Sequence, residues 1–270
     1  MQKKHLLYVP MIVITIIMVF PIFWAILTSF KPADKITSAI PIIFFAPTLS
    51  NYQYLVSSLV NFQSHLLNSV IIAAGATVLC SIIGTMAAYS INRTRFRGRA
   101  SIAFFILSVR FIPPIVALIP LYVFYQLLGL YDTQLGLILV NTVFNLPIAV
   151  WLMQGFIGEI PKDLDEAAMM DGRSRLGALF RIVLPLAGPG AAVSGLFVFL
   201  FSWNEFLSAL LLTSRVAIPA SANLLQFLTV STALWGPLMA AAITMWVPPF
   251  IVFAILQRRI VRGLTLGAVR

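Results

Sequence analysis

Few residues of this chain could carry out acid–base, metal or nucleophilic chemistry. Of 270 residues, eight are Asp or Glu, two are His and one is Cys. His5 and His65 lie far apart and Cys80 lies in an apolar run, so no spacing suits a metal site or a catalytic pair. Gly172-Arg-Ser-Arg-Leu-Gly177 has the glycine spacing of a phosphate-binding loop, but Ala and Leu follow where Lys and Ser or Thr are required. We therefore expect no enzyme, and no cofactor or metal bound by this chain itself.

Five of the eight acidic residues gather in residues 158–185, called the acidic segment below. Asp163 and Glu166 have the spacing of a capping box, which predicts a helix start. The following Asp171-Gly172 pair is typical of a helix end. A second helix is expected after Ser174, with one apolar face formed by Leu176, Leu179, Phe180 and Val183. The pattern predicts two short, rigid helices separated by a sharp turn.

Two ionisable residues lie within long apolar runs. A charged side chain at the centre of a membrane costs about 2.5–3.5 kcal/mol on insertion scales, so it should face a polar cavity or a partner. Arg110 and Glu205, together with the polar neighbour Asn204, are therefore candidates for a translocation path. The alternatives are a structural ion pair or a side chain that reaches the membrane interface. Asn141, Asn145 and Asn204 are expected either to form hydrogen bonds between helices or to contact a solute.

The composition places these residues in a membrane. Hydrophobic residues make up 60% of the chain and charged residues 10%, against about 25% charged in soluble domains. A span needs about 20 apolar residues. The apolar runs predict an all-α membrane protein with six transmembrane helices, at about 6–30, 66–91, 100–128, 135–156, 186–212 and 236–256. The third of these spans is expected to be interrupted by Pro113, Pro114 and Pro120.

The basic residues predict the orientation of the chain. Fourteen of the 18 Lys and Arg residues lie in the N-terminus, the 93–99 loop, the acidic segment and the C-terminal tail. The positive-inside rule therefore places both termini and the acidic segment in the cytosol. The same rule explains the net charge of +10, so no nucleic-acid partner is expected.

This orientation divides the chain into four parts. Residues 1–30 are predicted to form the first transmembrane helix with a cytosolic N-terminus, and residues 31–65 an extracytoplasmic loop. Residues 66–257 would form a core of five spans that includes the acidic segment. Residues 258–270 would form a basic cytosolic tail.

Motifs in the acidic segment resemble a known family. Glu166-Ala-Ala-Met-Met-Asp-Gly172, followed by Ile182-Val-Leu-Pro185, is similar to the EAA loop of ATP-binding-cassette importer permeases. Nearly the whole chain resembles the six-span subunit of the maltose-type sugar branch. This second resemblance rests on Gly129-Leu-Tyr-Asp-Thr133, Asn145-Leu-Pro147, Trp151, Ser202-Trp-Asn-Glu-Phe206 and Arg262-Gly-Leu-Thr-Leu-Gly-Ala-Val269. It implies a type I importer permease fold and import of a sugar or polyol.

The resemblance also implies partners. Residues 161–185 would dock on a cytosolic ATPase, and ATP and Mg would be bound by that ATPase rather than by this chain. The implied coupling residues are Asp165, Glu166, Ala167, Ala168, Met169, Asp171 and Gly172. The remaining partners would be a second permease subunit, two ATPase subunits, an extracytoplasmic solute-binding protein that contacts residues 213–235, and the lipid of a bacterial or archaeal plasma membrane. The tail at 262–270 would also reach the ATPases.

Three alternatives stay open on the residues alone. An importer permease for a non-sugar solute shares most of the pattern. A secondary carrier or channel should carry a coupling carboxylate deep in the bundle, whereas Asp132 lies in a loop and Glu205 lies near the end of a span. A membrane enzyme is disfavoured because no catalytic constellation is present.

Overall fold

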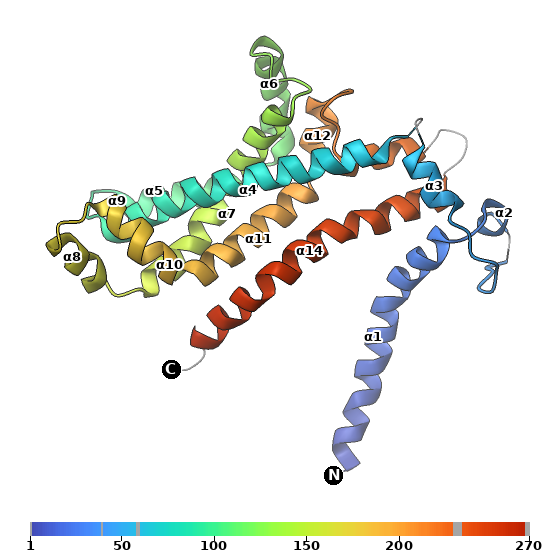
Figure 1. The fold of residues 1–270 in the computed structure, drawn as a ribbon, viewed down its shortest axis with the longest axis horizontal. Coiled ribbons are helices and arrows are strands. Elements are labelled where there is room, and N and C mark those ends of the chain that lie inside the picture. Colours follow the sequence, from blue (N-terminus) through green and yellow to red (C-terminus); the bar gives the residue numbers. More distant parts are fainter. Residues whose placement is uncertain (1, 39, 58–59, 229–233, 268–270) are drawn as a thin grey trace. The chain divides into compact units, whose positions relative to one another are not determined.

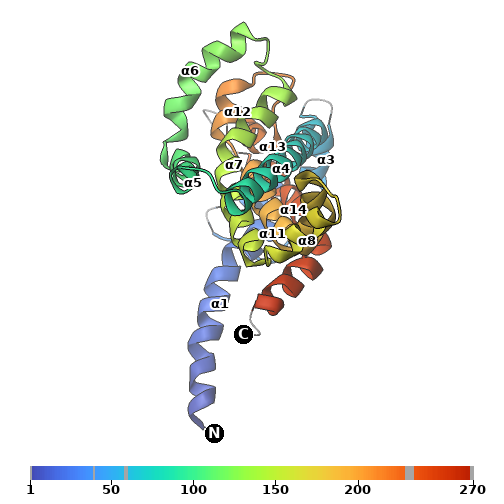
Figure 2. The ribbon, with the colours of Figure 1, turned by 90° about the vertical axis from the view of Figure 1, so that its left-hand side faces the viewer.

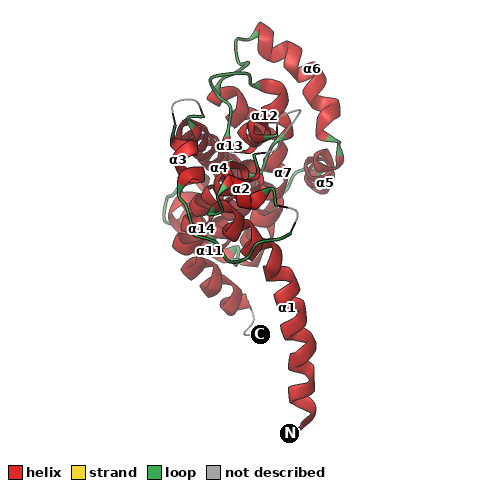
Figure 3. Ribbon diagram, turned by 90° about the vertical axis from the view of Figure 1, so that its right-hand side faces the viewer, coloured by secondary structure: helices red, strands yellow, loops and turns green. Residues whose placement is uncertain are grey.

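The chain is helical throughout the part that the structure describes. The computed structural model describes residues 2–38, 40–57, 60–228 and 234–267. In these ranges the regular elements are helices joined by loops and turns, without a strand element (Figures 1, 2 and 3). The predicted all-α class is confirmed.

Four helices are long and apolar enough to cross a membrane as single rods. They are α1 (Gln2–Ser29), α4 (Phe62–Arg93), α7 (Gln134–Glu159) and α14 (Trp235–Gly267). Two further candidate spans are bent pairs of helices. If each bent pair is counted as one span, the number reaches the predicted six.

The first bent pair lies in the interrupted span predicted at 100–128. Helix α5 (Arg99–Ser108) and the 3-10 turn η1 (Val109–Phe111) meet α6 (Pro114–Leu127) at an angle of 88°. Pro113 and Pro114 lack the N–H groups that would continue the helix, and Pro114 instead starts α6. The predicted interruption at Pro113 and Pro114 is confirmed, whereas Pro120, also predicted to interrupt the span, lies inside α6.

The second bent pair joins the acidic segment to the fifth predicted span. Helices α9 (Arg175–Ala178) and α10 (Leu184–Leu186), with the π-helical turn η2 (Leu179–Val183) between them, meet α11 (Gly188–Trp203) at 82°. The span predicted at 186–212 is not continuous, because α11 ends at Trp203 and α12 (Leu207–Leu212) begins after a break. A helix end in an apolar segment needs its own hydrogen-bond partners.

The chain divides into two compact units, which are described separately. One unit comprises residues 1–66 and 223–247. It contains α1, the short helices α2 (Ala33–Ile36) and α3 (Ser50–Val56), the turn η3 (Leu224–Phe227) and the start of α14. The Asn51 amide of α3 donates to the carbonyls of Ser29 and Lys31, each at 2.9 Å, and so fixes the end of α1. A Cβ on Gly236 would lie 2.4 Å from the Asn51 side chain, so this close approach requires glycine.

The other unit, residues 67–222 and 248–270, is organised around α7. Half of the most apolar window of α7 is buried, against a third for α4. A Cβ on Gly84 would meet Ala149 at 3.0 Å, so the small residues of α4 permit close packing on α7, as expected for helices in lipid. A buried cluster joins α4, α6, α7, α12 and α13 (Ala220–Asn223) through Ile72, Leu118, Leu137, Val140, Ala209 and Ala222.

Candidate functional site

The acidic segment begins with helix α8 (Asp163–Met170). The helix follows Lys162, and no side chain caps its N-terminus, so the predicted Asp163 and Glu166 capping box is wrong. Asp163, Asp165 and Glu166 all lie in the first turn of the helix. Their negative charge is favourable there because the helix dipole leaves partial positive charge at the N-terminus.

The turn after α8 has the geometry predicted for Gly172. The backbone of Gly172 has φ of +81°, which lies in the left-handed region that favours glycine. Its N–H donates to the Met169 carbonyl at 3.0 Å, and the Arg173 N–H donates to the Ala168 carbonyl at 3.1 Å. This pair of bonds is a Schellman motif, which satisfies the last carbonyls of α8. The predicted sharp turn at Gly172 is confirmed.

One face of α8 is fixed against helix α4 by a buried ion pair. The Nε atom of Arg93, the last residue of α4, contacts the Oδ2 atom of Asp165. Arg93 also donates from Nη2 to the Ile160 carbonyl at 2.8 Å. The Asp165 side chain is 5% exposed and Ala168 is also buried, so neither is accessible to a partner. Among the predicted coupling residues, these two therefore lie on the inner face of α8.

The opposite face of α8 is free. Glu166, Ala167, Asp171 and Gly172 are exposed, and Met169 is half-buried. Met170 is 88% exposed and also belongs to this face. The sequence reasoning omitted Met170, although its position four residues after Glu166 places both on one side of a helix.

The second helix begins where predicted. The Ser174 hydroxyl accepts a hydrogen bond from the Gly177 N–H at 3.1 Å and caps α9. Leu179 and Val183 are fully buried, whereas Leu176 and Phe180 are about half exposed. The predicted four-residue apolar face is therefore only partly correct, and the π-helical turn at Leu179–Val183 changes the register of its side chains.

Arg110 lies at the bend between α5 and α6. Its Nη1 atom donates to the Phe144 carbonyl of α7 at 3.0 Å. Its guanidinium carbon lies 5.0 Å from the centre of the Phe201 ring of α11. Arg110 is not in either of the two ion pairs that the described residues form. The structural ion pair considered from the sequence is therefore wrong for the described part of the chain.

Asn204 and Glu205 lie together at the break between α11 and α12. The Glu205 carboxylate accepts hydrogen bonds from the Ser208 N–H at 3.0 Å and from the Ser208 hydroxyl, so it caps the start of α12. The Asn204 amide donates to the Leu200 carbonyl at 2.8 Å at the end of α11. Both side chains thus satisfy backbone groups at this break. Their place on a translocation path stays a prediction.

The two buried asparagines of α7 bond within their own helix. The Asn141 amide donates to the Leu137 carbonyl and the Asn145 amide to the Asn141 carbonyl, each at 2.9 Å. The predicted hydrogen bonds between helices are therefore wrong for these two donors. The Asn141 Oδ1 atom is buried and has no hydrogen-bond partner.

Comparison with known proteins identifies the family. The model of the binding-protein-dependent transport system inner membrane component family matches residues 80–266. The chain belongs to this family. We therefore refer to it below as the permease. The match begins inside α4 and includes the acidic segment, the Arg110 bend and the Asn204 break.

Curated relatives of the permease align along almost their full length. The trehalose/maltose transport system permease protein MalG of Thermococcus litoralis is 35% identical and is covered to 97%, with 99% of this chain aligned. The sulfoquinovosyl glycerol transport system permease protein SmoH of Agrobacterium fabrum is 36% identical, over 93% of this chain and 88% of the relative. The trehalose transport system permease protein SugB of Mycobacterium tuberculosis is 36% identical, over 93% and 92%.

A solved structure has the same fold. A chain of a bacterial ABC transporter involved in the import of the acidic polysaccharide alginate superposes with a TM-score of 0.78 at 22% identity, over 95% of both chains. The predicted type I importer permease fold is therefore confirmed. At this identity, the comparison concerns the fold alone.

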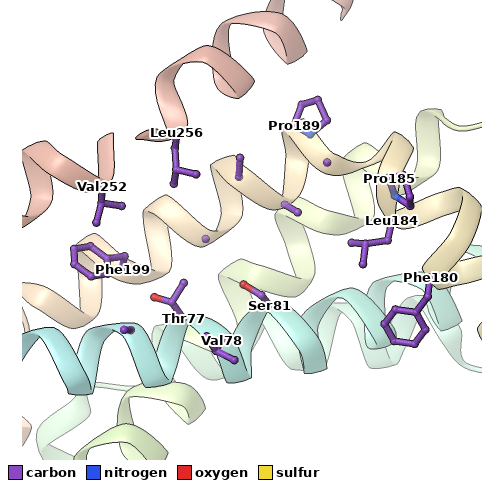
Figure 4. A pocket seen from close by; sticks show the side chains of 15 residues that line it. Thr77, Val78, Ser81, Phe180, Leu184, Pro185, Pro189, Phe199, Val252 and Leu256 are labelled. Atoms are coloured by element: carbon purple, nitrogen blue, oxygen red, sulfur yellow. The ribbon is translucent and has the colours of Figure 1, made fainter. Parts of the chain in front are cut away.

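A cavity of about 810 Å³ lies among α4, α10, α11 and α14 of the permease (Figure 4). Its walls are mostly apolar, and Phe199, Val252 and Leu256 are among the residues that line it. Thr77 and Ser81 of α4 supply hydroxyl groups, although the Thr77 hydroxyl donates to the Ala73 carbonyl at 2.7 Å. None of the predicted path residues lines this cavity.

Asp132 connects two loops that are far apart in the sequence. Its carboxylate accepts hydrogen bonds from the N–H groups of Ser214, Arg215, Val216 and Ala217 at 3.0–3.1 Å, and from the Ser214 hydroxyl at 3.0 Å. We call this arrangement the Asp132 clip. Burial alone would raise the pKa of Asp132, but the hydrogen bonds from Ala217, Ser214 and Val216 prevail and lower it. Sequence reasoning missed this role because the bonded groups lie 82 to 85 residues away.

Proposed function

We propose that the permease is one of two membrane subunits of an ATP-driven importer for a sugar or polyol, and that α8 is its docking surface for an ATPase. One observation carries the proposal. Helix α8 is bound to α4 on one face by the Arg93–Asp165 ion pair, while its other face exposes Glu166, Ala167 and Met170. A short helix of this kind can fill a groove on a partner and transmit its movement.

The geometry suggests how a movement of the ATPase would reach the membrane. The Schellman turn at Gly172 and the Ser174 cap make the two short helices of the acidic segment stiff. Leu179 and Val183 pack with Ala88 and Tyr89 of α4 and with Met153 of α7. Displacement of α8 would therefore move the membrane helices α4 and α7 together with it. ATP and Mg would be bound by the partner ATPase, because the phosphate-loop lysine is absent here.

The relatives support the class of solute. The names of three of them refer to trehalose/maltose, sulfoquinovosyl glycerol and trehalose, each of which contains a sugar unit. The rival interpretation as a secondary carrier finds no support in Glu205, because its carboxylate is used as a helix cap. A carrier would need a carboxylate available to the coupling ion.

The proposed assembly contains a second permease subunit, two ATPases and an extracytoplasmic solute-binding protein in a bacterial or archaeal plasma membrane. The family name itself specifies dependence on a binding protein. The basic residues support the proposed orientation, with both termini and the acidic segment in the cytosol. In that orientation the Asp132 clip lies on the extracytoplasmic side, where the binding protein would dock.

The test is copurification from the source membrane. The tagged permease is isolated in mild detergent, copurified proteins are identified by mass spectrometry, and ATP hydrolysis is measured with the binding protein and candidate sugars. We expect an ATPase in the wild-type complex and its loss from Ala167→Trp, since the larger side chain blocks the exposed face. Leu127→Trp on α6 is the control, because Leu127 is exposed on another helix. An ATPase retained equally by both variants would contradict docking on α8.

A further inference from the structure

A second cavity, of about 530 Å³, lies in the unit formed by residues 1–66 and 223–247. Six of its lining residues matter here, namely Phe20, Trp24, Thr28, Lys31, Trp235 and Met239. Phe20, Trp24 and Thr28 belong to α1, Lys31 follows the end of this helix, and Trp235 and Met239 lie at the start of α14. The cavity therefore lies where the C-terminal end of the candidate span Pro10–Ser29 meets the N-terminal end of the candidate span Trp235–Arg258.

Lys31 places a buried positive charge at this cavity. The residue is 3% exposed, and its ammonium nitrogen lies 4.2 Å from the centre of the Trp24 ring and 5.6 Å from that of Phe45. The two ion pairs of the described residues do not include it. The Asn51 bond to its carbonyl and its own N–H bond to the Thr28 carbonyl at 3.1 Å hold its backbone in place. A buried ammonium without a carboxylate partner is costly and favours an anion.

Thr28 supplies a second unsatisfied polar group. Its residue exposure is 7%, and its Oγ1 atom is buried without a hydrogen-bond partner. Buried hydroxyl groups are normally hydrogen-bonded, so an unpaired one at a cavity wall indicates a missing acceptor or donor. The oxygen of an anion near Lys31 would provide that acceptor.

The rest of the lining is suited to hydrocarbon. Trp24 lies five residues before the end of the candidate span Pro10–Ser29, and Trp235 is the first residue of the span Trp235–Arg258. Tryptophans gather at the level of lipid headgroups. Phe20 and Met239 lie further into the same two spans, so the wall becomes apolar toward the membrane interior.

We propose that this cavity binds one anionic phospholipid. The lipid phosphate accepts hydrogen bonds from the Lys31 ammonium and the Thr28 hydroxyl, and the first acyl methylenes pack against Phe20, Trp24 and Met239. A free phosphate ion would use only the polar end of a mostly apolar cavity. The Lys31 charge favours a headgroup with a net negative charge over a zwitterionic one. The proposal does not depend on which solute is imported.

Native mass spectrometry of the purified transporter tests this binding. The complex is reconstituted in nanodiscs of equimolar phosphatidylglycerol and phosphatidylcholine, released, and its retained lipids are counted. We expect one phosphatidylglycerol on the wild type and roughly fivefold lower retention in Lys31→Met, with retention restored in Lys31→Arg. Lys35→Met is the matched control, because Lys35 is partly exposed and paired with Asp34. Equal retention in Lys31→Met and the wild type, or equal retention of the two lipids, would overturn the proposal.

Two further arms distinguish other occupants. Thr28→Val keeps the shape of the side chain, so a loss of lipid in this variant reflects the lost hydroxyl rather than a loss of fold. The loss should be smaller than in Lys31→Met. Release of phosphatidylglycerol by inorganic phosphate would mean that the polar end binds free anions, and would overturn a lipid site. A photo-reactive residue at Trp235 should crosslink to lipid. Crosslinking only to another subunit would show that protein fills the cavity, and would also overturn the proposal.

Discussion

The acidic segment and the Asp132 loop both tie together distant parts of the permease, but with different chemistry. In the acidic segment, Asp165 is held by the side chain of Arg93. In the loop, Asp132 is held almost wholly by backbone N–H groups of residues 214–217. The first tie depends on two side chains, whereas the second depends on the Asp132 carboxylate and, apart from the Ser214 hydroxyl, on backbone groups.

This difference affects what each region can present to a partner. The ion pair uses the inner face of α8, and only the outer face remains for docking. The Asp132 clip uses the backbone N–H groups of Arg215 and Val216, so the side chains of these two residues stay exposed and form no part of it. The loop can therefore change its exposed side chains without losing its shape, whereas α8 cannot change Asp165 without a compensating change at Arg93.

The largest expected effect is on the ion pair. Arg93→Met should destabilise the permease by about 3–5 kcal/mol, because it leaves the Asp165 carboxylate buried without a partner. The measurement is thermal unfolding in detergent, together with solute uptake per ATP hydrolysed. Arg97→Met is the matched control, because Arg97 is exposed in the loop after α4.

A double variant separates charge from packing. Arg93→Met combined with Asp165→Leu removes both charges and should recover most of the lost stability, since apolar replacement of a buried ion pair is often neutral. If the double variant is no more stable than Arg93→Met alone, the stranded carboxylate is not the cause. A loss in Arg97→Met equal to that in Arg93→Met would assign the effect to the net charge of this loop.

The next effect concerns the Asp132 clip. Asp132→Asn keeps the shape but removes the negative charge that accepts several N–H groups, which should cost about 1–3 kcal/mol locally. We expect a higher concentration of binding protein for half-maximal ATPase stimulation, with the maximal rate less affected. Asp34→Asn is the control, because Asp34 is exposed and pairs only with Lys35. An unchanged binding-protein dependence in Asp132→Asn would mean that the clip does not position the docking loop.

The lowered pKa of Asp132 gives the clip a defined pH dependence. A carboxyl group with a lowered pKa in the fold contributes stability above its ordinary pKa of 3.8, and this contribution is lost as the pH falls through the lower folded value. The stabilisation should therefore be constant through neutral and mildly acidic pH. Thermal unfolding of wild type and Asp132→Asn against pH should show a constant difference there. A difference that already declines at mildly acidic pH would contradict the lowered pKa.

Much of the fold follows from local sequence. Apolar runs and prolines predict where helices lie and where the 100–128 span bends, since both effects act within a few residues. Gly172 and Ser174 predict a turn and a cap for the same reason. The buried state of Asp165 is not predictable in this way, because Arg93 lies in another span.

Other features of the site also depend on contacts across the fold. The Asp132 clip joins groups at least 82 residues apart, and no local pattern indicates it. Glu205 reads as an embedded charge in the sequence, yet it serves a helix end that becomes visible only once α11 stops at Trp203. The carboxylates of Asp132 and Glu205 thus accept hydrogen bonds from backbone N–H groups.

The smallest effect on stability is expected on the outer face of α8, and it sharpens the contrast with the inner face. Glu166→Gln should change the free energy of unfolding by less than about 0.5 kcal/mol, because the side chain is exposed and does not cap the helix. It should still weaken ATPase binding, since it removes a charge from the proposed docking surface. Asp163→Gln is the matched control in the same first turn.

Stability and ATPase affinity should then be separable. Arg93→Met lowers stability first, whereas Glu166→Gln lowers ATPase affinity in a stable protein. If Glu166→Gln and Asp163→Gln bind the ATPase equally well, the charge of Glu166 serves only the helix dipole, and recognition must rest on Ala167 and Met170.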